Sequence, residues 1–339
     1  MKKKYQNGFF IFGLVVLGIM LTQLDYSEVW SGIQRAGYWF LAVVVLWAAL
    51  YMLNTAAWYI IIRQGRHNAG GSGLTDKTRK VGYWWLYKIT ISGFALNYAT
   101  PGGLMGGEAY RIMELTPRLG AERATSSVIL YVMTHIFSHF WFWLLSAIIF
   151  MVTQPLTFAS AMVAVLALGF SVLGIWFFMK GYKKGLAMRL AKWLSRIPGI
   201  NRWAKNIVEN HQEKLRNIDL QIAALHKQNP RTFIGAVALE LACRFISCFE
   251  IMFCLLVLTP DVSYIQCVIM LAFTSLFANL LFFIPLQLGG REGGFMMSAA
   301  GLAMTASSGI FTALIIRIRE LIWTAAGLML IKIQPNHKK

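Results

Sequence analysis

The sequence predicts an all-α integral membrane protein with eight membrane segments, six full-spanning helices and two re-entrant helical hairpins, arranged as an inverted repeat. Of its 339 residues, 57% are hydrophobic and only 14% are charged, which is too apolar for a soluble domain. Apolar runs of roughly 20 residues, enough to cross about 30 Å of hydrocarbon, recur along the chain. Two further apolar runs lead into segments rich in proline and glycine. We therefore expect one polytopic membrane domain, 1–339.

Six apolar runs are predicted to be full spans. They cover about 8–24, 38–62, 124–152, 157–179, 231–258 and 309–331. The first run follows a basic start, as in a secretory signal peptide, but "DYSEVW" comes after it and offers no small-residue cleavage site. The run is therefore predicted to be the first membrane helix.

The loop charges predict the orientation of these spans. Lysine and arginine gather at the N-terminus, in 63–80, in 180–230 and after the last span, and this places both chain termini in the cytoplasm of a bacterial inner membrane. The connectors 25–37, 153–156 and 259–263 contain one arginine and no lysine, so they are expected outside. The formal charge of +18 is thus explained by topology and by anionic lipid headgroups, without a nucleic-acid partner.

The basic loop 180–230 contains "GLAMRLAKWLSRI", in which apolar and basic residues occupy opposite faces of a helix. This pattern predicts an interfacial helix on the inner leaflet. The alternative is a helix that packs against its own protein. In either case it is not expected to be catalytic.

The two remaining apolar runs, 83–99 and 264–284, each end at a Pro/Gly-rich segment. Six full spans satisfy the loop charges only if each of these runs leaves the membrane on the side where it entered. We therefore expect one hairpin at about 83–110 in a first half, 1–152, and a second hairpin at about 264–296 in a second half, 157–339. They would enter from opposite faces. The competing interpretation makes 264–284 a complete span followed by a short or broken return.

Two matching motifs lie at the hairpin tips. "PGGLMGGE" (101–108) and "PLQLGGRE" (285–292) both place leucine three residues after the proline and glutamate seven residues after it. Proline ends a helix, glycine permits a tight turn, and the following half-helix offers free N–H groups to an anion. Gly/Pro-interrupted segments in corresponding places are typical of inverted-repeat transporters. The predicted hairpin-backbone residues are Pro101, Gly102, Gly103, Gly106, Gly107, Pro285, Gly289 and Gly290.

Charged residues inside the apolar runs indicate a polar interior, because each one costs at least about 2.5–3.5 kcal/mol to insert. The candidate substrate-binding residues are Glu108, Arg111, Arg291, Glu292, Arg317, Arg319 and Glu320. Arg317 and Arg319 project to different helix faces, so at most one should face a given cavity. Whether Glu108 and Glu292 touch a substrate or only stabilise the hairpins stays open at this point. Glu240 and Arg244, four residues apart, are predicted to form a structural ion pair.

Other chemistry has weak support in the sequence. His135 and His139 have metal-ligand spacing, but no third ligand accompanies them, so packing is favoured over a metal site. The aspartates lie far apart in connectors, and no phosphate-binding loop motif occurs. We therefore expect neither an enzyme, nor a metal, nor a cofactor.

"TPGGLMGGEAYR" and "IPLQLGGREGG", in a chain of six to eight membrane helices, resemble the transmembrane-domain family of the lysylphosphatidylglycerol synthases, whose members are often called flippase-like. The resemblance implies a central cavity built by re-entrant segments and movement of an aminoacylated or otherwise charged lipid between leaflets. Leu286 and Gln287 depart from the family's usual glycines after the second proline. The soluble aminoacyltransferase domain of the two-part synthases is also missing, which leaves the lipid open.

The favoured hypothesis is therefore a lipid transporter whose partners are membrane lipids with an anionic or aminoacylated headgroup. One alternative is a membrane transferase acting on a lipid or polyprenyl-linked substrate, with Glu108 or Glu292 as general base. The other is a scaffold for a separate lipid-synthesising enzyme.

Overall fold

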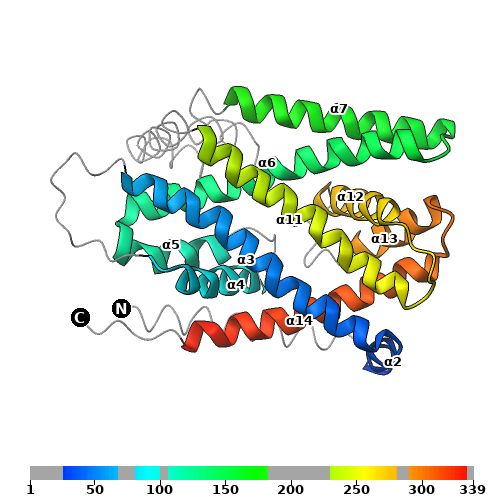
Figure 1. Cartoon of the computed structure of the whole chain (residues 1–339), viewed down its shortest axis with the longest axis horizontal. Helices are drawn as coiled ribbons and strands as arrows, with labels where there is room; N and C mark the ends of the chain where they lie inside the picture. The colour runs from blue at the N-terminus through cyan, green and yellow to red at the C-terminus, as the bar shows by residue number, and fades with distance from the viewer. Residues whose placement is uncertain (1–25, 68–80, 100–105, 182–229, 281–289, 334–339) are drawn as a thin grey trace, which may run out of the picture.

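The structure is a computed structural model, and it describes residues 26–67, 81–99, 106–181, 230–280 and 290–333 (Figure 1). All regular structure in these ranges is helical, which confirms the predicted all-α class. Three helices are long and apolar enough to cross a membrane, and they match three of the predicted spans: 38–63, 121–153 and 158–179. The predicted span 8–24 and the predicted interfacial helix within 180–230 lie outside the described residues.

Five long helices run along the length of the molecule (Figure 1). They are α3 (Tyr38–His67), α6 (Ala121–Thr153), α7 (Phe158–Gly181), α11 (Pro230–Leu256) and α14 (Ala306–Ile333). Helices α11 and α14 have 27 and 28 residues, or about 40 Å at 1.5 Å per residue, so they too have the length of a span. Helices α11 and α14 carry charged residues along their middle parts, whereas those of α3, α6 and α7 lie near the helix ends.

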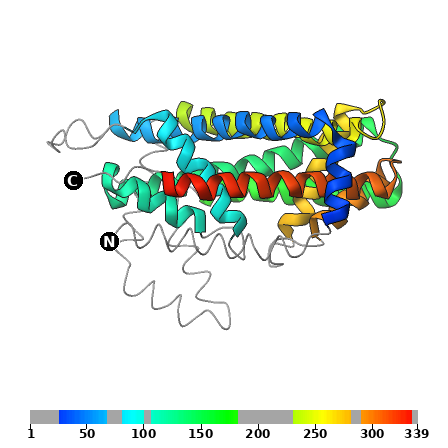
Figure 2. The ribbon, with the colours of Figure 1, turned by 90° about the horizontal axis from the view of Figure 1, so that it is seen from below.

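Four short helices form two pairs. They are α4 (Tyr83–Ala99) with α5 (Gly106–Leu119), and α12 (Tyr264–Leu280) with α13 (Gly290–Gly301). The two members of each pair pack against each other, and the pairs lie at opposite ends of the molecule (Figures 1 and 2). At 12 to 17 residues each helix is about 18–26 Å long, too short to cross about 30 Å of hydrocarbon alone. Both pairs therefore have the dimensions of a hairpin.

Each of the two sequence motifs falls between the two helices of a pair. Pro101, Gly102 and Gly103 in 100–105, and Pro285 and Gly289 in 281–289, lie outside the described residues. Three of the predicted hairpin-backbone residues are described: Gly106 and Gly107 begin α5, and Gly290 begins α13. The glycines thus stand where a new helix begins.

The segment 25–37, expected as a connector, contains a further helix, α2 (Tyr26–Ala36). Ala36 is buried while Trp30 is 63% exposed, so the helix presents one face to the protein. It packs against α14, and Gly37, with φ of +52°, lets the chain turn into α3. Loop charge reports the side of the membrane on which a segment lies and says nothing of its local fold, which is why the helix was missed.

The helices of the two halves pack in the same order. Helix α3 packs against α4, α4 against α5 and α5 against α6; in the second half α11 packs against α12, α12 against α13 and α13 against α14. The halves also exchange contacts, since α4 packs against α14 and α12 against α6. Helices α3 and α11 run in opposite directions along the long axis, as do α6 and α14 (Figure 1).

Glycine permits the closest of these approaches. A Cβ atom on Gly107 of α5 would collide with the carbonyl oxygen of Gly93 in α4. A Cβ atom on Gly327 of α14 would collide with the side chain of Ala95, and the hydroxyl of Ser92 donates to the Gly327 carbonyl oxygen at 3.0 Å. Helix α4 thus packs closely against both α5 and α14.

Candidate functional site

Glu108 and Glu292 occupy the same place in the two helix pairs. Each is the third residue of the helix that follows the break, in α5 and α13 respectively. A carboxylate in the first turn is stabilised by the positive end of the helix dipole. The side chains are 18% and 34% exposed, so both glutamates lie at a partly accessible position.

Glu108 belongs to the first cluster, which also contains Asn97 and Arg111. Asn97 Nδ2 donates to Glu108 Oε1 at 3.0 Å, while Asn97 Oδ1 accepts the backbone N–H of Gly107 at 2.8 Å. Asn97 therefore ties the end of α4 to the beginning of α5. Arg111 Nη1 lies 3.4 Å from the same Glu108 oxygen.

The Arg111 side chain is buried among aromatic rings. Its guanidinium lies 4.8 Å from the ring centre of Phe94, 5.3 Å from Tyr131 and 5.6 Å from Trp58. Arg111 Nη2 donates to the Thr90 carbonyl oxygen at 3.4 Å, and the buried Nε has no hydrogen-bond partner among the described residues. Cation–π contacts, worth about 2 kcal/mol when desolvated, therefore supply much of what holds this charge.

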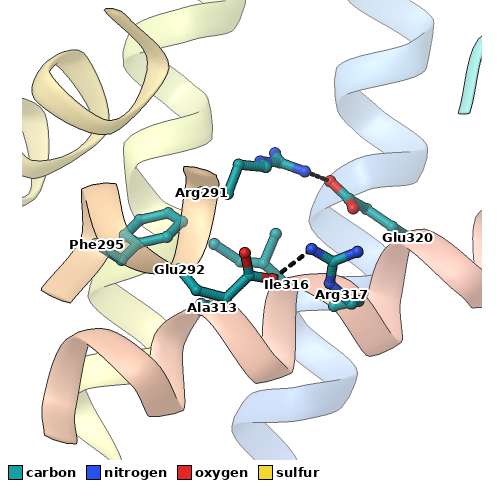
Figure 3. Close-up of a pocket in the computed structure, with 7 residues that line it drawn as sticks. All are labelled: Arg291, Glu292, Phe295, Ala313, Ile316, Arg317 and Glu320. Atoms are coloured by element: carbon teal, nitrogen blue, oxygen red, sulfur yellow. Dashed lines mark hydrogen bonds and ion pairs between the residues drawn. The ribbon is translucent and has the colours of Figure 1, made fainter. Parts of the chain in front are cut away.

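The second cluster lies between α13 and α14 (Figure 3). Arg291 donates to Glu320 and Arg317 donates to Glu292, so two ion pairs join the helices. Together with Phe295, Ala313 and Ile316 these side chains line a partly open hollow of about 180 Å³, in which no space is wide enough for a water molecule. The ion pairs therefore fill this hollow.

Arg319 points away from this hollow. Its Nε and Nη2 donate to the two carboxylate oxygens of Glu250 in α11 at 2.7 and 3.1 Å, and its guanidinium lies 3.8 Å from the ring centre of Trp47. Arg319 and Glu250 are 1% and 5% exposed. Of the two arginines, Arg317 faces the hollow and Arg319 forms a buried bidentate ion pair.

Glu250 was not among the predicted site residues. Its signal was a carboxylate inside an apolar span, ten residues after Glu240. Among the described residues the buried charged side chains are Glu240, Glu250, Glu320, Arg111, Arg118 and Arg319.

Tyr98, next to the last residue of α4, lies within electrostatic range of Arg291, Arg319 and Glu320. A residue of the first helix pair thus lies near the charges of the second cluster.

The expected ion pair between Glu240 and Arg244 is not direct. Glu240 Oε2 lies 2.8 Å from Nδ1 of His135 in α6. Arg244 instead bonds Ser138 Oγ at 2.8 Å, His139 Nε2 at 2.8 Å and the His135 carbonyl oxygen at 2.9 Å. Glu240 and Arg244 are linked through α6, because the side chain of each lies closer to polar groups of α6 than to the other side chain. His135 therefore has the acidic neighbour that the sequence did not reveal.

A metal site does not emerge from the described ranges, where no group of three or more His, Cys, Asp or Glu side chains could hold an ion. The four cysteines are unpaired and buried, which agrees with a packing role.

The chain is similar to a known protein family. The family described as "Lysylphosphatidylglycerol synthase TM region" matches residues 8–327. No curated protein and no solved structure matches the chain.

Proposed function

The chain belongs to the family of the lysylphosphatidylglycerol synthase transmembrane region, and from this premise we propose that it moves a lipid with a charged headgroup between the two leaflets of the membrane. The observation that carries the proposal is the second cluster, where paired charges lie in a hollow next to residues from both hairpin-like pairs. The headgroup would pass through this polar region while the acyl chains remain in lipid.

An inverted repeat is the first part of the proposal. The packing order supports it, because exchanging α3 with α11, α4 with α12, α5 with α13 and α6 with α14 leaves the order of helix contacts unchanged. The opposite directions of α3 and α11 support a two-fold axis perpendicular to the long axis (Figure 1). Transporters of this design bind substrate near the midplane, between the repeats.

Re-entry of the two short pairs is the second part. Helices too short to cross the membrane, joined by a Pro/Gly break, are tolerated at membrane depth where they are buried in protein or line a polar path. Both pairs meet these conditions, since α4 is packed against α14 and α12 against α6. With both chain termini in the cytoplasm, as the loop charges predict, α4 and α5 would enter from the cytoplasmic side.

Headgroup binding would exchange one ion pair for another. Glu292 is 34% exposed and Arg317 12%, so this pair is more accessible than the Arg319–Glu250 pair. A lipid phosphate can replace Glu292 at Arg317, and a headgroup amine can replace Arg317 at Glu292. A headgroup that carries both a phosphate and an amine keeps these charges paired during the exchange, whereas a purely anionic headgroup adds a negative charge that has to be compensated.

We propose a transporter in preference to an enzyme because Glu108 and Glu292 both contact an arginine. A general base has to reach the proton that it removes, and the arginine already occupies that side of each carboxylate. A separate lipid-synthesising enzyme as partner remains part of the proposal.

The test uses the full chain in phosphatidylcholine vesicles that contain a fluorescent phosphatidylglycerol. Dithionite quenches only the outer leaflet, so the slow phase of quenching measures transfer. We expect R317Q and E292Q to slow transfer by at least about tenfold, the effect of losing one charged contact of about 1.4 kcal/mol in the rate-limiting step. Lys88, exposed on α4, provides the control variant K88Q.

Unchanged transfer in both R317Q and E292Q, with normal folding, would overturn the assignment of this ion pair. Absence of transfer of any charged lipid by the unmodified protein would overturn transport itself. A covalently altered lipid recovered from the vesicles would favour the transferase.

A further inference from the structure

The polar group between α6 and α11 has no part in the headgroup exchange. It comprises His135 and His139 on α6 with Glu240 and Arg244 on α11. Glu240 is 1% exposed and bonds only through Oε2, since its buried Oε1 has no partner in the described ranges. The His135 side chain is 31% exposed. A buried carboxylate thus contacts a histidine that reaches a more accessible region.

His139 has a fixed protonation state. Its Nδ1 lies 3.1 Å from the His135 carbonyl oxygen, which can only accept, so Nδ1 carries a hydrogen. Its Nε2 lies 2.8 Å from Arg244 Nη1, which can only donate, so Nε2 carries none. A second proton would have to displace the guanidinium, and His139 is therefore neutral.

His135 differs in this respect. Its Nδ1 faces the Glu240 carboxylate, while its Nε2 has no hydrogen bond among the described residues and is not one of their fully buried unpaired atoms. Nε2 is thus free to accept a proton from water, and the resulting imidazolium would be paired with Glu240 at 2.8 Å.

The charges around His135 come from two neighbouring helices. On α11, the Glu240 carboxylate contacts the His135 ring and Arg244 bonds the His135 carbonyl oxygen. On α5, Arg111 lies 5.3 Å from the ring of Tyr131, which lies 6.3 Å from the His135 ring. Helix α12 has no charged residue, and the side chains of Arg63 on α3 and Lys88 on α4 are exposed. Helix α7 also packs against α6, and its charged residue, Lys180, lies next to its last residue.

The charge of the headgroup supplies the reason for a proton. An anionic headgroup brings a negative charge to membrane depth, where a charge without compensation is costly. We propose that His135 and Glu240 form a proton-binding site, and that an anionic lipid headgroup is carried together with one proton on His135 Nε2. The proton comes from water on one side and returns to water when the headgroup leaves. By linkage, the headgroup strengthens proton binding as much as the proton strengthens headgroup binding.

This inference rests on the proposed lipid transport, and a binding experiment separates the two. Short-chain dihexanoyl phosphatidylglycerol is titrated into the full chain in an uncharged detergent, by calorimetry in two buffers of different ionisation enthalpy. The difference in heat gives the number of protons taken up. We expect the unmodified protein to take up as much as one proton for each lipid bound.

Two glutamine variants form a matched pair. H135Q keeps a donor toward Glu240 but cannot be protonated, so it should bind lipid more weakly and take up no proton. H139Q keeps an acceptor for Arg244 and a donor for the His135 carbonyl oxygen, so it should retain proton uptake. In the vesicle assay, transfer by the unmodified protein and by H139Q should slow as the pH rises, by up to about tenfold per pH unit. Transfer by H135Q should be independent of pH.

Lipid binding without proton uptake, or equal uptake by H135Q and the unmodified protein, would overturn the proton site and leave lipid transport standing. Failure of all three proteins to bind any charged lipid would overturn lipid transport and the proton site with it.

Discussion

Helices α5 and α13 begin alike and hold their charges differently. Both place a glutamate at the third position, but Glu108 is neutralised by Arg111 on its own helix, while Glu292 is neutralised by Arg317 on α14. Phe295 occupies the position in α13 that corresponds to Arg111, three residues after the glutamate. The Glu108–Arg111 contact is thus made within one helix, whereas the Glu292–Arg317 contact depends on how α13 lies against α14. Relative movement of α13 and α14 would separate Glu292 from Arg317 and leave Glu108 and Arg111 together.

The largest effect is expected at the Arg319–Glu250 pair. Changing Glu250 to Gln leaves a buried arginine with only half of its carboxylate contacts and an uncompensated charge. Loss of one partner of a buried ion pair costs about 3–5 kcal/mol, so thermal unfolding in detergent should shift to a markedly lower temperature. E292Q, at a more exposed pair, is the matched control and should unfold near the temperature of the unmodified protein. Equal shifts of the unfolding temperature in the two variants would contradict a larger contribution of the more deeply buried ion pair to stability.

The next effect tests how closely α4 and α5 pack in the first helix pair. Gly107→Ala adds a methyl group where the Gly93 carbonyl oxygen of α4 lies. Overpacking of this kind costs about 1–3 kcal/mol, and α5 should separate from α4, which disturbs the Asn97 contacts. G293A is the control, because a Cβ atom at Gly293 of α13 would meet nothing within 4 Å. Cysteine cross-linking between α4 and α5 measures the separation; unchanged cross-linking in G107A would contradict the close approach.

A smaller effect is expected for Arg111→Lys. The ammonium group keeps the charge but cannot spread over three rings as the planar guanidinium does, so the loss should be about 1–2 kcal/mol of folding free energy. The measurement is again thermal unfolding, with R63K as control, since the exposed Arg63 contacts a single ring at 5.5 Å. An unchanged unfolding temperature of R111K would instead mean that the Glu108–Arg111 ion pair, and not the contacts with the rings, holds the first cluster together.

Much of this arrangement was predictable from residues that break a local pattern. The Pro/Gly segments inside apolar runs predicted both helix breaks, and the shared spacing predicted that Glu108 and Glu292 would be equivalent. The motifs predict backbone conformation, because backbone conformation depends on local sequence. The partner of a charged side chain does not depend on local sequence: the Glu250–Arg319 and His135–Glu240 contacts join residues 69 and 105 positions apart. Only the packing of α11 against α14 and α6 decides those contacts, and no spacing rule connects them.

The smallest effect on stability, and the most informative for function, is expected from reversing the ion pair between α13 and α14. The double variant E292R/R317E keeps both charges and restores the contact, so its unfolding temperature should stay within a few degrees of the unmodified value, whereas each single reversal places like charges together. Lipid transfer should not be restored to the same extent. An anionic headgroup that exchanges with Glu292 requires its cation on α14, and the double variant moves that cation to α13. Full recovery of both stability and transfer would mean that only the presence of an ion pair matters, and that the headgroup does not distinguish between the two helices.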